Sequence, residues 1–128
     1  MEEEIMMKLN MFEQQIRQLQ QQLQAIEQAD MEIKKLNENL GDIIGSENKE
    51  ILASIGKGIF AKAKLISDEL MVDIGDGNIV KKTVPETKKI IEKQLDKLAE
   101  IKEELENNLD MIEQEMTKEI INAQQKEQ

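Results

Sequence analysis

Apolar residues recur in alternating steps of three and four at both ends of the 128-residue chain. The first series carries two polar interruptions, Asp30 and Asn37. This spacing is typical of the buried seam of a coiled coil, in which a polar seam residue disfavours other registers. We therefore expect a first helix over residues 2–40, roughly 60 Å long at the rise of an α-helix. Its seam positions are Ile5, Leu9, Phe12, Ile16, Leu19, Leu23, Ile26, Ile33 and Leu40. Gly41 is expected to end the helix as a left-handed cap.

The same spacing returns toward the other end of the chain, with interruptions at Lys102 and Glu119. Its apolar positions are Ile91, Leu95, Leu98, Leu105, Leu109, Ile112 and Met116. We expect a second helix over residues 83–123. Two seams of similar length predict an antiparallel coiled coil, in which facing residues have numbers that sum to about 125.

The start of this second helix has two possible caps. Thr83 and Glu86 are three residues apart, as in a capping box, and Pro85 lies in the first turn. Val84 is the alternative cap, because a residue before proline is pushed toward extended geometry.

Between the helices the apolar period changes to two, which predicts two β-hairpins within residues 50–82, here called the β block. The first hairpin turns at residues 56–58 and the second at residues 75–78, both of which are rich in glycine. Isolated two-stranded hairpins are at best marginally stable in water, so we expect obligatory oligomerisation through the β block. The residues expected to mediate it are Ile51, Ile55, Ile59, Phe60, Ala61, Ala63, Leu70, Val72, Ile74, Ile79 and Val80.

Composition narrows the class of protein. Hydrophobic residues make up 39% of the chain but aromatic residues only 2%, which disfavours a large globular core. The net charge of −10 argues against nucleic acid and anionic membranes as partners. Cysteine is absent, and no early apolar run resembles a signal peptide or a membrane span. We expect a cytoplasmic protein.

The sequence offers little catalytic chemistry. Histidine and cysteine are absent, so we expect no enzymatic activity, no cofactor and no metal. Asp73, Asp76 and Asn78 faintly resemble a calcium loop, but Val84 stands where the bidentate glutamate is needed, which favours a hairpin turn. The acidic stretch of the second helix is interpreted as a solvated face, with contact to a basic partner as the alternative. Its residues are Glu103, Glu104, Glu106, Asp110, Glu113 and Glu115.

Methionine is concentrated where the antiparallel helices bring the chain ends together. Six of the eight methionines lie there: Met1, Met6, Met7, Met11, Met111 and Met116. Methionine is flexible and polarizable and is over-used on promiscuous binding surfaces. We therefore predict that this end, called the tip, binds non-native chains; the alternative is that the termini are merely frayed. The predicted tip residues are Met6, Met7, Leu9, Met11, Phe12, Ile112, Met116, Ile120 and Ile121.

Residues 50–65 and 70–82 resemble the two hairpins of prefoldin α-type subunits. The resemblance rests on the two glycine turns and the intervening Ala61-Lys62-Ala63, although Ser54 stands where α-type subunits usually have proline. Subunits of the β type carry one hairpin. The resemblance implies a single prefoldin-like domain over residues 1–128. Its implied fold is α+β but mostly α, a long antiparallel two-helix coiled coil with two inserted hairpins that assemble into an oligomeric β-barrel body.

The resemblance also implies a function. Two α-type and four β-type subunits would form a hexamer, an ATP-independent holdase in the cytoplasm. Its coiled-coil tips would bind unfolded or nascent polypeptides and deliver them to a group II chaperonin. Two alternatives remain open: a structural coiled-coil protein that assembles through its hairpins into rings or filaments, and an adaptor that recruits one folded partner.

Overall fold

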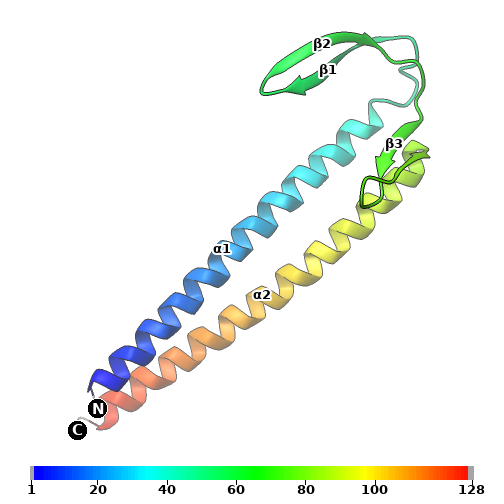
Figure 1. Ribbon diagram of the computed structural model, residues 1–128. Helices are drawn as coiled ribbons and strands as arrows, with labels where there is room; N and C mark the ends of the chain where they lie inside the picture. The colour runs from blue at the N-terminus through cyan, green and yellow to red at the C-terminus, as the bar shows by residue number, and fades with distance from the viewer. Residues whose placement is uncertain (1, 127–128) are drawn as a thin grey trace. The chain divides into compact units, whose positions relative to one another are not determined.

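The computed structural model describes residues 2–126, which contain two long helices separated by two β-hairpins (Figure 1). The elements, in chain order, are α1 (Glu2–Gly41), β1 (Glu50–Gly56), β2 (Ile59–Lys64), β3 (Leu70–Asp73), β4 (Ile79–Lys82) and α2 (Val84–Lys126). This mostly α arrangement confirms the predicted fold of the single chain, and the assembly of the hairpins into a β-barrel body stays a prediction. The chain divides into two compact units: a helical unit of residues 2–31 with 96–126, and a hairpin unit of residues 32–95.

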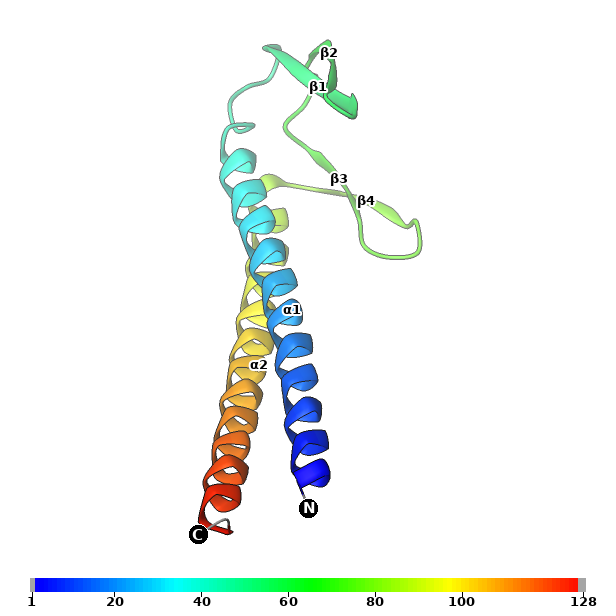
Figure 2. The same cartoon turned by 90° about the vertical axis from the view of Figure 1, so that its left-hand side faces the viewer.

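In the helical unit, α1 and α2 lie side by side and antiparallel, so the start of α1 and the end of α2 share one end (Figures 1 and 2). The predicted seam is confirmed here, because every predicted apolar seam position is partly buried while most residues between them are exposed. The partly buried seam residues are Ile5, Leu9, Phe12, Ile16, Leu19, Leu23 and Ile26 on α1, with Leu98, Leu105, Leu109, Ile112 and Met116 on α2.

The hairpin unit contains a small apolar core where the two helices meet the β block. Leu40, Val84 and Ile91 are buried there. Full burial of an aliphatic side chain contributes roughly 1.5–3 kcal/mol. Leu70, the first residue of β3, packs against this core, so the second hairpin is anchored to the helix ends. The other residues packed against the core are Ile33, Ile43 and Leu95.

Thr83 caps α2. Its Oγ1 accepts a hydrogen bond from the backbone N–H of Glu86 at 3.2 Å, and the helix begins at Val84. This geometry confirms Thr83, and not Val84, as the cap, because the side-chain oxygen satisfies a backbone donor that has no partner within the helix. The other end of α2 extends to Lys126, three residues beyond the predicted end at Ala123.

The prediction that Gly41 forms a left-handed cap is wrong. Gly41 is the last residue of α1 and does not adopt a positive φ. The N–H of Asp42 donates instead to the carbonyl of Asn39 (3.1 Å), and the next N–H donates to the carbonyl of Leu40 (3.2 Å). These bonds span three residues, so the helix ends in a tightened turn, and the left-handed conformation comes later at Gly45 (φ 76°).

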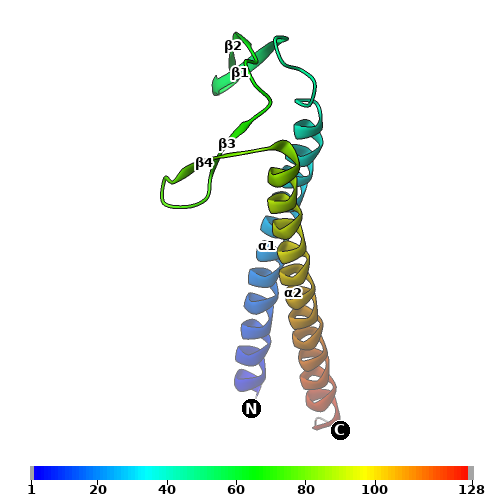
Figure 3. The same ribbon diagram turned by 90° about the vertical axis from the view of Figure 1, so that its right-hand side faces the viewer.

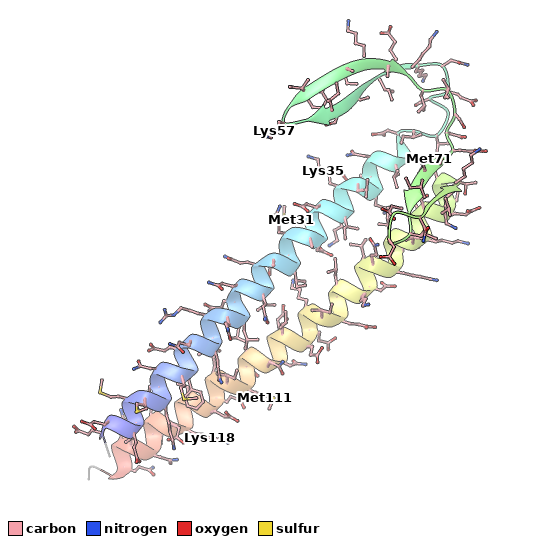
Figure 4. All side chains as sticks on the ribbon, in the orientation of Figure 1. Met31, Lys35, Lys57, Met71, Met111 and Lys118 are labelled. Atoms are coloured by element: carbon pink, nitrogen blue, oxygen red, sulfur yellow. The ribbon has the colours of Figure 1, made fainter. Side chains whose placement is uncertain are left out.

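The first hairpin pairs β1 and β2 antiparallel, with Ala53 opposite Ala61. Lys57, labelled in Figure 4, and Gly58 form its two-residue turn, with φ values of 48° and 79°. Two positive φ values match the type I′ turn that suits the twist of a hairpin. Ile55 lies at a β-bulge between Ser54 and Gly56, so the predicted alternation of the first strand is interrupted there.

The second hairpin pairs β3 and β4, with Val72 opposite Val80 (Figure 3). Its turn has the same geometry, because Asp76 and Gly77 have φ values of 52° and 77° and the N–H of Asn78 donates to the carbonyl of Gly75 at 2.9 Å. One Asp73 carboxylate oxygen accepts the N–H of Gly75, also at 2.9 Å. The carboxylate of Asp73 therefore stabilises the turn, as its sequence context favours.

Candidate binding surfaces

The two residues that interrupt the α2 seam, Lys102 and Glu119, each form an ion pair with a residue of α1. Lys8 Nζ lies 3.8 Å from Glu119 Oε1, and Lys102 Nζ lies 3.8 Å from Glu27 Oε1. Lys102 also approaches Glu106 of its own helix at 3.9 Å. These pairs were not predicted, although facing residues of opposite charge whose numbers have a constant sum would have indicated them. The residue numbers sum to 127 for Lys8 with Glu119 and to 129 for Lys102 with Glu27, both near the predicted 125.

The predicted tip residues divide into two groups. Met6, Met7 and Met11 on α1 are well exposed, Met7 at 66%, and Ile120 and Ile121 on α2 are exposed to a lesser degree. The seam residues of the tip are partly buried between the helices: Leu9, Phe12, Ile112 and Met116. The tip therefore presents flexible apolar side chains above an apolar seam. Met1 lies outside the described residues.

The exposed methionines do not form one continuous face. Met7 and Met11 are one turn apart and share a face of α1, whereas Met6 points to a different side of the helix. Lys8 lies between them in the sequence and pairs with Glu119 on α2, which ties the two helices together at the same level. The tip thus offers apolar contacts in several directions around a fixed helix pair, an arrangement suited to ligands without a fixed shape.

The β block presents a second apolar surface. Within the described chain, β1 pairs only with β2 and β3 only with β4, so each hairpin leaves strand edges unpaired. Most of the large apolar residues predicted to mediate assembly are exposed: Ile51, Ile55, Ile59, Phe60, Ile74 and Ile79. The remaining predicted residues are partly buried: Ala61, Ala63, Leu70, Val72 and Val80. Leu52 and Met71 were not predicted to mediate assembly, yet they are as exposed as the others and lie on the opposite faces of their strands.

Other chemistry is sparse in the described residues. No group of three or more acidic residues in residues 2–126 is arranged to hold a metal ion. The acidic stretch of α2 is exposed along its length, as a solvated helix face would be. No helix in the same described range is long and apolar enough to cross a membrane.

Residues 12–128 match the family described as prefoldin subunit. The chain belongs to the prefoldin family. The prefoldin subunit alpha of Methanobrevibacter smithii is 32% identical over 108 residues, which cover 84% of this chain and 69% of that protein. The prefoldin subunit alpha of Methanosphaera stadtmanae is 32% identical over an alignment of 95 residues, and the match covers 66% of this chain and 67% of that protein.

The fold is also similar to a solved prefoldin. A cryo-EM structure of filamentous PFD from Methanocaldococcus jannaschii superposes with a TM-score of 0.80. The match covers 90% of this chain and 97% of that chain at 18% sequence identity. The family match and the two relatives named prefoldin subunit alpha confirm the resemblance to prefoldin α-type subunits that was inferred from the two hairpins.

Proposed function

We propose that this chain is the substrate-holding subunit of a prefoldin-type chaperone, an ATP-independent holdase for protein folding. The single observation that supports this function best is the exposure of Met6, Met7 and Met11 at one end of the helical unit. Soluble proteins seldom expose grouped apolar side chains unless these bind a partner. Flexible methionines can fit the varied side chains of unfolded or nascent polypeptides, whereas a rigid pocket could not.

The proposal includes assembly through the β block. Unpaired strand edges and exposed side chains such as Phe60 and Ile79 favour pairing with hairpins of other subunits. We propose β-type prefoldin subunits as these partners, in a hexamer of two α and four β chains whose hairpins form a β-barrel body. The whole chain, residues 1–128, would act as one prefoldin-like domain in the cytoplasm and deliver its substrates to a group II chaperonin. No enzymatic step, cofactor or metal is part of the proposal.

Co-expression with a β-type prefoldin subunit tests both the holdase function and the assembly through the β block. Native mass spectrometry of the purified complex should give a closed particle of two α and four β chains. Light scattering should show that this particle suppresses aggregation of a chemically denatured protein after dilution without ATP. A closed particle with no such suppression would refute the holdase function, and failure to form any complex would refute the proposed assembly.

One observation favours a second function. The solved structure that this fold resembles is that of a filamentous PFD, and free hairpin edges could also propagate an open array. The alternative is therefore a structural coiled-coil protein that assembles into rings or filaments without holding substrates. Electron microscopy separates the two, because open fibres without aggregation suppression would support the structural function.

A further inference from the structure

The first hairpin leaves one edge of β2 without a partner strand. Within residues 2–126, β2 pairs with β1 alone, and β3 and β4 form a separate sheet (Figure 1). Leu65, directly after β2, donates its N–H at 3.1 Å and accepts a hydrogen bond at its carbonyl at 2.7 Å, both with the chain just before β1. Successive residues of a strand turn their backbone groups to opposite sides, and the pairing of residues 60–64 is regular. The N–H and C=O groups of Lys62 and Lys64 therefore lie on the outer edge.

The two faces of β2 differ in chemistry. Lys62 and Lys64 alternate with Ala61 and Ala63, so the lysines share one face of the strand and the alanines share the other. Both lysines are exposed, and neither forms an ion pair in the part of the chain that the structure describes. The outer edge thus presents two positive charges on one face and two small apolar side chains on the other.

The inner side of β2 shows which neighbours suit these positions. Glu50 of β1 lies opposite Lys64, and Ile51 lies opposite Ala63. Residues directly opposite each other in an antiparallel pair are in contact, and opposite charges there stabilise the pairing whereas like charges weaken it. A strand in which acidic residues alternate with large apolar residues would therefore meet the outer edge of β2 as the start of β1 meets its inner edge.

A second copy of the chain does not supply such a strand. Two β2 strands that overlap fully and antiparallel would place Lys62 opposite the same lysine of the other copy. β1 and β3 carry one acidic residue each, and β4 carries none. Glu50 already faces Lys64 of its own hairpin, and Asp73 accepts the N–H of Gly75 at 2.9 Å. The charges on the β2 edge therefore favour a different chain.

We propose that the outer edge of β2 receives an edge strand of a different chain, in which two acidic residues alternate with large apolar residues and lie opposite Lys62 and Lys64. The inference rests on the proposed assembly through the β block and specifies the chemistry of the partner strand. Main-chain hydrogen bonds supply the affinity that any added strand would gain. The two lysines supply the choice of partner, because they attract an acidic strand and repel a basic one, including β2 of a second copy.

Three capped fluorescent peptides test the proposal on the purified full-length chain. The first alternates glutamate with isoleucine, the second has lysine in place of each glutamate, and the third is the glutamate peptide with N-methylated backbone amides. The edge variant combines Lys62→Glu with Lys64→Glu. The control variant combines Lys89→Glu with Lys93→Glu, the same change in charge at exposed positions of α2. Fluorescence anisotropy measures the affinity of each peptide.

Wild type and the control variant should bind the glutamate peptide about fivefold or more tightly than the lysine peptide, because opposite-charge pairs replace like-charge pairs. The edge variant should show the reverse preference. The N-methylated peptide should bind wild type weakly, because it cannot complete the main-chain hydrogen bonds. An unchanged preference in the edge variant, or full binding of the methylated peptide, would overturn the proposal. So would a wild-type chain that closes into a homo-oligomer and binds no peptide, since a second copy would then cover the edge.

Co-expression with a β-type prefoldin subunit separates this inference from the proposed function. If the edge variant forms the same particle as wild type and that particle suppresses aggregation, the proposed function stands and the assignment of the β2 edge is refuted. If wild type shows the expected peptide preference but forms no particle with the β-type subunit, the edge assignment stands and the proposed assembly is refuted.

Discussion

Lys102 of α2 places its Nζ 3.8 Å from Glu27 Oε1 of α1, at a seam position between Leu98 and Leu105. The Lys102 side chain is 44% exposed, so water screens the pair. Ion pairs of this kind contribute roughly 0–1 kcal/mol. The pair mainly fixes how the two helices are aligned along their length. Sliding one helix past the other would separate the lysine from its carboxylates and place it among apolar residues.

Replacing this lysine should therefore raise stability. Lys102→Leu completes the apolar seam, and we expect the midpoint of thermal unfolding to rise by roughly 2–8 °C for each 1 kcal/mol gained. Far-UV circular dichroism measures the midpoint. Lys118→Leu, at an exposed position off the seam, is the control and should leave the midpoint nearly unchanged. A lower midpoint for Lys102→Leu would show that the ion pair outweighs apolar packing here.

The tip can be tested without disturbing the seam. Changing Met6, Met7 and Met11 together to Ser should leave the assembly mass and helix content unchanged, since all three side chains are exposed. Suppression of aggregation, followed by light scattering, should fall severalfold because the apolar contacts with substrate are lost. Met31→Ser, at a methionine on α1 that is 67% exposed but far from the tip in sequence, is the control. Wild-type suppression by the triple variant would remove the tip from the substrate-binding surface.

A substitution in the β block should change the assembly of subunits and leave the helices intact. Ile74→Ser changes a residue that is 60% exposed in the single chain, so we expect the helix content to be retained. The particle mass measured by native mass spectrometry should fall, because the serine would enter an apolar contact between subunits at a cost of roughly 1–3 kcal/mol. Ile66→Ser, between the two hairpins, provides a matched control. An unchanged particle would exclude Ile74 from the subunit contact.

The cap of α2 offers a stability test in the hairpin unit. Thr83→Ala removes the acceptor of the 3.2 Å hydrogen bond from Glu86 N, and we expect a loss of about 1 kcal/mol in the free energy of unfolding. Thr83→Ser should retain most of that stability. Thr117→Ala is the control, because the Thr117 hydroxyl donates only to the carbonyl one turn earlier on an exposed face. Urea unfolding compares the variants, and equal losses at both positions would argue against a capping role.

The sequence predicted those features that depend on local periodicity. The partial burial of seam residues such as Leu19 and Ile112 was predicted from apolar positions three and four residues apart, because a helix pair can bury only one stripe of each helix. The cap at Thr83 and both glycine turns follow from residue types with narrow backbone preferences. Family membership followed from the two hairpins together.

Features that depend on neighbouring structure escaped prediction. Gly41 can complete a helix as well as end one, and the choice depended on hydrogen bonds made by the residues after it. The bulge at Ile55 follows from the tight turn beyond it, and alternation alone does not encode that geometry. The hollow that Gln18 of α1 and Asn108 of α2 line needs both helices in their observed alignment, since these residues are ninety residues apart in the chain.

The conformation of Lys57 bears on which substitutions the first hairpin can accept during evolution. It holds a left-handed backbone conformation, φ 48°, which costs a non-glycine residue roughly 1–2 kcal/mol, and asparagine adopts this conformation more readily. The turn therefore lies below its attainable stability, as is usual for proteins shaped by mutation and selection. One substitution, Lys57→Asn, could offset a destabilising change elsewhere in the hairpin. A turn stabilised in this way would let the exposed apolar residues of the first hairpin diversify. The subunit could then acquire new assembly partners without losing its fold.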